Sequence, residues 1–275
     1  MTLALRKASS TAATFVLAAA AVLLAGCAGT GGAGSTTTAT PDRITASDES
    51  DATKRARVRL ELASAYFGRG MMTTALDEVK LAIAADPTVS AAFNLRGLIY
   101  ASLGDEQLAE ESFRRALQLD ARDADAMQNY GWYLCQRKRY DEAEAMFDRA
   151  LAVPQYRDAQ RTIVSKGVCQ ARRNEWALAE QTLMTAYEMN PGSAVAAVNL
   201  SEVLYHRGGY ERARFYMRRV NDRPEVVTAG SLWLALRIER RLGNEDGVRD
   251  LSYRLRSRFP ESRETAALNE GRFDD

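Results

Sequence analysis

The amino-acid sequence predicts an all-α fold, a superhelical solenoid of about six helix-turn-helix units, on the strength of three observations. An alanine recurs at intervals of 34, 34, 36 and 34 residues, at Ala75, Ala109, Ala143, Ala179 and Ala213. A second alanine follows each of the first four by seven residues, which is two helical turns along one face. Apolar residues between the alanines recur at three- and four-residue spacing, which is typical of helices that bury one face. Because small residues let two helices pack closely, each period is interpreted as one helix pair, and stacking buries the apolar faces.

The other recurring residues match the tetratricopeptide pattern. Gly70, Gly104 and Gly208 fall at the turn between the two helices, and Pro87 and Pro191 close their units. The predicted solenoid covers residues 51–265, followed by a C-terminal tail at 266–275. Its units lie near residues 56–89, 90–123, 124–159, 160–193, 194–228 and 229–262. The last unit lacks the recurring alanine and is interpreted as a degenerate terminal repeat, because an end repeat has one uncovered face.

The first 50 residues contain no repeat and predict targeting and tethering. Arg6 and Lys7 precede an apolar stretch at residues 14–24 that is short for a transmembrane span, and Leu24-Ala25-Gly26-Cys27 follows. This tetrapeptide resembles a bacterial lipobox. The resemblance implies a lipoprotein signal peptide at residues 1–26, an acylated Cys27, and sorting to the outer membrane, since an aspartate does not follow Cys27. Residues 27–50 are expected to be a flexible linker. The alternative is an ordinary secretory signal, or an uncleaved anchor, in which Cys27 has no role.

Composition argues against several classes of function. Hydrophobic residues make up 46% of the chain and charged residues 27%, as expected of a globular body, and the formal net charge is +1. This balance gives no bulk attraction to nucleic acid. His206 is the one histidine, and no metal-binding, nucleophile or nucleotide-binding motif is present. The sequence therefore predicts a protein that is not an enzyme and that needs no cofactor, metal or small-molecule substrate.

Cys135 and Cys169 occupy the first helices of adjacent units, which are neighbours in a solenoid. In an oxidising periplasm they are candidates for a disulfide that closes 34 residues and stabilises the fold by about 3–4 kcal/mol. The alternative is a pair of buried free thiols that act as small apolar side chains.

The candidate partner-binding groove is the inner face of the solenoid, formed by the first helices of the units. In the first three units the sequence predicts that this groove carries an apolar and aromatic stripe with amide groups beside it, which suits a peptide segment of a partner. Its residues are Leu60, Phe67, Asn94, Leu98, Gln128 and Trp132. The alternative is that some of these side chains only pack between repeats. The arginine-rich last unit is either the polar outer face of a capping repeat or a contact for anionic lipid or protein.

Several stretches resemble a known family, the type IV pilus biogenesis and stability lipoproteins (PilF/PilW). They are residues 57–63, 72–79, 96–100, 109–117 and 129–135, within a resemblance over about residues 24–223. Its strength lies in non-consensus positions, such as Arg96, where tetratricopeptide units usually carry an apolar residue. The resemblance implies a pilotin: an outer-membrane lipoprotein that faces the periplasm, binds the secretin subunit, and promotes secretin localisation and multimerisation for pilus assembly and twitching motility. The inner leaflet of the outer membrane would hold the acylated Cys27.

Two other functions remain open at this stage. The same repeats and anchor would serve a general lipoprotein adaptor for peptidoglycan enzymes or outer-membrane protein assembly. A cell-wall enzyme with a dispersed active site is the second alternative, and the single histidine argues against it.

Overall fold

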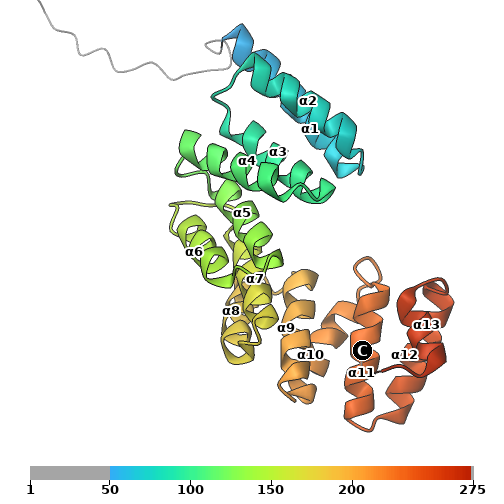
Figure 1. The fold of residues 1–275 in the computed structure, drawn as a ribbon. Helices are drawn as coiled ribbons and strands as arrows, with labels where there is room; N and C mark the ends of the chain where they lie inside the picture. Colours follow the sequence, from blue (N-terminus) through green and yellow to red (C-terminus); the bar gives the residue numbers. More distant parts are fainter. Residues whose placement is uncertain (1–49, 274–275) are drawn as a thin grey trace, which may run out of the picture. The chain divides into compact units, whose positions relative to one another are not determined.

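The computed structural model describes residues 50–273, which form thirteen α-helices and no strands (Figure 1). The first helices of the six units are α1 (Asp51–Gly68), α3 (Ser90–Leu103), α5 (Ala124–Gln136), α7 (Ala159–Arg172), α9 (Ala194–His206) and α11 (Ala229–Arg241). Their partners are α2 (Met72–Ala85), α4 (Glu106–Leu119), α6 (Tyr140–Leu151), α8 (Trp176–Met189), α10 (Tyr210–Asn221) and α12 (Glu245–Arg258). The last helix is α13 (Arg263–Glu270). The all-α tetratricopeptide solenoid predicted from the sequence is confirmed.

The helices pack in chain order. Each first helix packs against its partner, each partner packs against the next first helix, and successive first helices also touch. The recurring alanines lie in these contacts and are fully buried, at Ala75, Ala109, Ala143, Ala179 and Ala213. Their burial explains the period, because a larger side chain at these positions would force the helices apart.

The turn between the two helices of a unit needs a left-handed residue. Glycine provides it in four units, for example Gly104 with φ of 83°. In the third and fourth units the same conformation is taken by Lys138 (φ 62°) and Asn174 (φ 67°), which carry a Cβ atom. The turn geometry is therefore kept where the glycine is lost, at a conformational cost to the lysine.

Helix α13 crosses residue 266, where the sequence analysis placed the start of the tail. It contacts α11 and α12, and its Leu268 is buried against the core of the last units. The side chain of Ser262 caps its first turn by accepting a hydrogen bond from the backbone N–H of Thr265 at 3.1 Å. This helix covers apolar surface that the last unit would otherwise expose.

The predicted signal peptide, Cys27 and residues 28–49 of the predicted linker lie outside the described residues. Ser50, the last residue of that linker, caps α1 by accepting a hydrogen bond from the backbone of Thr53. None of the helices within residues 50–273 combines the length and apolar character needed to cross a membrane.

Candidate partner-binding surfaces

Four of the residues predicted to line the groove are half-buried on the first helices of the first three units. Leu60 and Phe67 on α1 pack against the core of units one and two. Leu98 on α3 and Trp132 on α5 pack against the core beneath units two and three. We call these four residues the A-helix face. Each side chain packs against the core and keeps part of its surface exposed, and its contact with a partner stays a prediction.

The two amides predicted beside this face are placed differently. Asn94 and Gln128 are buried, with 9% and 6% of their surface exposed. Asn129 on α5 donates a hydrogen bond to Asn94 on α3 at 3.2 Å, and Gln128 on α5 donates one to Ser165 on α7 at 3.3 Å. Because successive first helices lie so close together, the amides bond to the neighbouring repeat, and their contact with a partner stays a prediction.

One charged group, Arg172, borders Trp132. The guanidinium carbon of Arg172, on α7, lies 4.8 Å from the centre of the Trp132 ring. Near the first turns of these helices, Asp125 of α5 accepts hydrogen bonds from Arg161 of α7 at 2.9 Å and from the hydroxyl of Tyr156, in the loop before α7, at 3.1 Å. The indole is therefore held between repeats, with a cation over its face.

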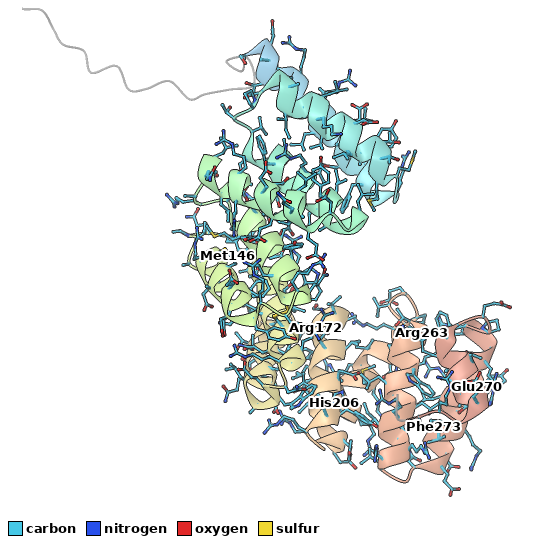
Figure 2. All side chains as sticks on the ribbon, viewed as in Figure 1. Met146, Arg172, His206, Arg263, Glu270 and Phe273 are labelled. Carbon is cyan, nitrogen blue, oxygen red and sulfur yellow. A yellow bond between two sulfur atoms is a disulfide. The ribbon has the colours of Figure 1, made fainter. Side chains whose placement is uncertain are left out.

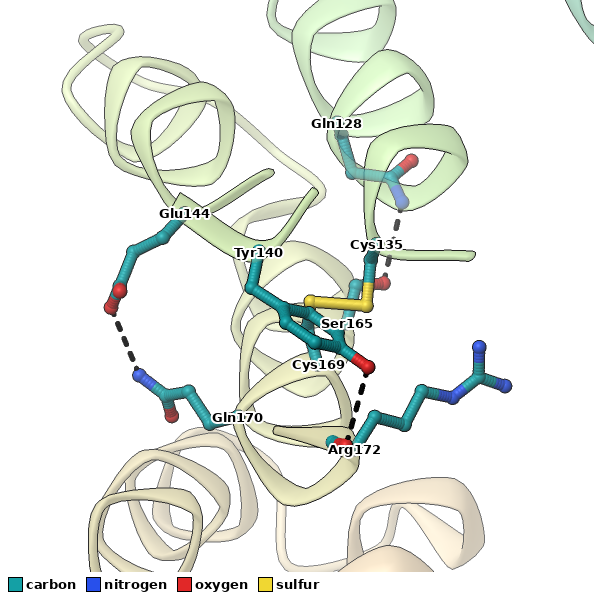
Figure 3. The surroundings of a disulfide bond; sticks show 8 residues. All are labelled: Gln128, Cys135, Tyr140, Glu144, Ser165, Cys169, Gln170 and Arg172. Carbon is teal, nitrogen blue, oxygen red and sulfur yellow. Dashed lines mark hydrogen bonds between the residues drawn. A yellow bond between two sulfur atoms is a disulfide. The ribbon is translucent and has the colours of Figure 1, made fainter. Parts of the chain in front are cut away.

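A disulfide joins Cys135 on α5 to Cys169 on α7, with 5.8 Å between the Cα atoms (Figure 3). Both cysteines are buried, at 1% and 5% exposed. The ring of Tyr140 packs in the same core cluster, and its hydroxyl donates to the backbone carbonyl of Arg172 at 3.3 Å. The bond joins α5 and α7, the same helices that carry Trp132 and Arg172, so it restrains that part of the face.

An ionic network links units two and three. Glu110 on α4 accepts hydrogen bonds from Arg139 at 2.8 Å, Tyr130 at 2.9 Å and Arg114 at 2.6 Å. The bond from Arg139 holds the pKa of the Glu110 carboxyl below its usual value, although burial acts in the opposite direction. Burial also raises the pKa of the Tyr130 hydroxyl. Tyr130 and Arg139 of unit three both donate to Glu110 of unit two, and Arg114 donates to it from the same helix, so Glu110 is the centre of a structural network that joins the two units.

The sequence analysis missed one residue of interest, Phe273. Phe273, labelled in Figure 2, comes shortly after α13. Its ring stacks on Trp233 of α11 with 5.5 Å between ring centres. A single aromatic residue in a polar tail has no periodicity, so no pattern could have indicated this contact.

Comparisons with known proteins agree on the repeat and point to one family. The tetratricopeptide repeat model matches residues 88–155. The type IV pilus assembly protein PilF of Pseudomonas aeruginosa is 25% identical over 205 residues, covering 74% of this chain and 81% of that protein.

Two solved structures superimpose on most of the chain. The crystal structure of PilW, a widely conserved type IV pilus biogenesis factor, is 31% identical with a TM-score of 0.72, and the match covers 78% of this chain and 98% of that one. The structure of Pseudomonas aeruginosa PilF, at 23% identity and a TM-score of 0.69, matches 81% of this chain and all of that one, and shows the shared fold. The 31% identity to PilW over nearly all of that protein places the chain in the PilF/PilW family of tetratricopeptide-repeat type IV pilus biogenesis proteins.

Proposed function

We propose that this chain is an outer-membrane lipoprotein that serves as a pilotin for the type IV pilus secretin. It binds the secretin subunit, brings it to the outer membrane and promotes its multimerisation. The observation that carries the proposal is the 31% identity to PilW over 98% of that protein, which spans the units bearing the A-helix face. Tetratricopeptide units act through protein contacts, and the proposal requires no catalysis.

The physical account has two parts. Acyl chains on Cys27 hold the protein at the periplasmic side of the outer membrane, since each buried methylene contributes about 0.8 kcal/mol. The A-helix face then captures a segment of the secretin subunit through Phe67, Trp132 and their aliphatic neighbours. Confining both proteins to one membrane raises their effective concentration, which favours ring assembly.

The first experiment is genetic. A strain lacking the gene should lose secretin multimers on gels and lose twitching motility, and the wild-type gene should restore both. A Cys27→Ser gene should give a folded protein that fails to restore the multimers, because the anchor is gone. Normal multimers and normal twitching in the deletion strain would refute the proposed function.

The second experiment locates the contact. A photo-reactive amino acid placed at Phe67 or at Trp132 in the full-length protein should crosslink to the secretin subunit in envelope membranes. The matched control is Tyr253, an aromatic residue on α12 that is 73% exposed and remote in sequence from this face. If Tyr253 crosslinks to the secretin subunit as strongly as Phe67 and Trp132 do, the A-helix face is not its binding site. Crosslinks to a peptidoglycan enzyme alone would favour a general adaptor.

A further inference from the structure

A second surface lies in the last two units, where arginines and aromatic rings form a pocket. The cavity has a volume of about 280 Å³ and is lined by Tyr205 of α9, by Arg237, Arg240 and Arg241 of α11, and by Phe273. We call it the arginine pocket. It shares no residue with the A-helix face and does not depend on the proposed function.

Contacts with Tyr205, on the preceding first helix, hold Arg237 and Arg241 in place. The guanidinium carbon of Arg237 lies 4.6 Å from the centre of the Tyr205 ring, and Nε of Arg241 donates to the Tyr205 hydroxyl at 3.2 Å. Only 12% of the Arg237 side chain is exposed. Arginines held by aromatic stacking lose little conformational entropy when they bind a carboxylate, because their orientation is already set.

The pocket carries an excess of positive charge. Among the described residues that line it, three bear a guanidinium group and none bears a carboxylate. The carboxylate of Glu202 lies 3.8 Å from Arg237 and is shared with His206 at 3.3 Å. Within residues 50–273, Nε of Arg237 is buried without a hydrogen-bond partner. Charge complementarity therefore favours an anionic occupant whose oxygens can accept hydrogen bonds from guanidinium groups.

Phe273 indicates that the occupant of the pocket also carries an aromatic side chain. Its ring stacks on Trp233, and the guanidinium carbon of Arg240 lies 4.0 Å from its centre. In the sequence two carboxylates follow this ring, Asp274 and Asp275, which lie outside the described residues. The position of the aromatic ring in the pocket is thus occupied by Phe273 of the chain itself, and an acidic sequence follows this residue.

We propose that the arginine pocket binds an acidic peptide segment of a partner protein, one with an aromatic residue beside its carboxylates, and that this segment displaces Phe273. The partner's carboxylates bind Arg237 and Arg240, and its ring takes the place between Trp233 and Arg240. Phe273 acts as an internal competitor that lowers the affinity of the free protein.

The test uses the full-length protein and a fluorescent peptide, Gly-Ser-Phe-Asp-Asp-Gly, with Gly-Ser-Phe-Asn-Asn-Gly as its neutral control. Binding is followed by fluorescence anisotropy at low and at raised salt. The acidic peptide should bind, the neutral peptide should bind at least about tenfold more weakly, and salt should weaken only the acidic one. Arg240→Gln should weaken binding about tenfold. The matched control Arg249→Gln changes an arginine on α12 that is 68% exposed and outside the pocket lining, and it should bind like the wild type.

Phe273→Ala tests displacement, because removing the competitor should tighten binding of the acidic peptide several-fold. Unchanged helical circular dichroism identifies variants that remain folded, and the exposed Arg240 can be replaced without opening the core. Failure of Phe273→Ala to bind the peptide, or equal weakening by Arg240→Gln and Arg249→Gln, would overturn the proposal. Weaker binding by Phe273→Ala would overturn the displacement. Binding to phosphatidylglycerol vesicles that Arg240→Gln abolishes, without peptide binding, would assign the pocket to lipid and overturn the peptide proposal.

Discussion

The close packing of α7 on α8 can be tested at Gly167, in the middle of a helix. A Cβ atom at this position would lie 2.6 Å from Cγ and 2.9 Å from Cδ2 of Leu183. Leu183 is fully buried, and Cγ is the branch point of its side chain, so it has little room to move. Overpacking of this kind costs about 1–3 kcal/mol, whereas replacing glycine by alanine within a helix contributes about 1 kcal/mol of stability. Because the contact is so short, we expect Gly167→Ala to lower the free energy of unfolding by about 1–2 kcal/mol.

A double-mutant cycle separates packing from helix propensity. Leu183→Ala alone removes the clashing atoms, leaves a cavity and should cost about 2–5 kcal/mol. In that background the added methyl group at Gly167 enters empty space, so Gly167→Ala should become stabilising by about 1 kcal/mol. The coupling energy between the two sites is then about 2–3 kcal/mol.

Urea unfolding followed by circular dichroism gives the four free energies. The control is Gly68→Ala at the end of α1, where nothing lies within 4 Å of the added Cβ atom, and it should leave the stability unchanged or raise it slightly. A Gly167→Ala protein at least as stable as the wild type, or the same cost in both backgrounds, would refute the reasoning.

Three further changes have expected outcomes. Cys135→Ser with Cys169→Ser should lower the free energy of unfolding by about 3–4 kcal/mol, because the disulfide spans 34 residues; equal urea midpoints with and without reductant would contradict this. Glu110 has a pKa below its usual 4.5 in the folded protein because Arg139 donates to it, so its contribution to stability is present at neutral pH and is lost as the pH falls through the folded pKa. Glu110→Gln should therefore flatten the acid limb of a stability profile measured below about pH 5, and an unchanged slope would argue against the network. Lys138→Gly should raise the melting temperature, since a lysine at φ 62° costs about 1 kcal/mol; calorimetry showing a lower value would exclude strain at that turn.

The repeats could be predicted from the sequence because they depend on local spacing. Each buried alanine occupies the same position in its own helix pair, so the same requirement for a small side chain recurs once in every period. The two cysteines were also placed on adjacent first helices by counting residues along the repeats, and the structure joins them. The lipid anchor at Cys27 is a prediction from the sequence alone and awaits its own test.

The positions of residues in the repeats predicted only part of the candidate site. Position in the repeat placed Phe67 and Trp132 on the first helices, but it could not tell that Asn94 and Gln128 bond to the neighbouring repeat. That outcome depends on how closely two first helices approach, which is a property of the stack.

By itself the sequence determined the architecture of this protein, its helix pairs and their order, because the physical constraint recurs within each unit of about 34 residues. Only the tertiary structure decided which side chains meet in the last two units. There Phe273 returns to Trp233, and Tyr205 holds arginines from the next unit. Such contacts join residues that share no period, so they are determined by the stacking geometry of the whole set of helices.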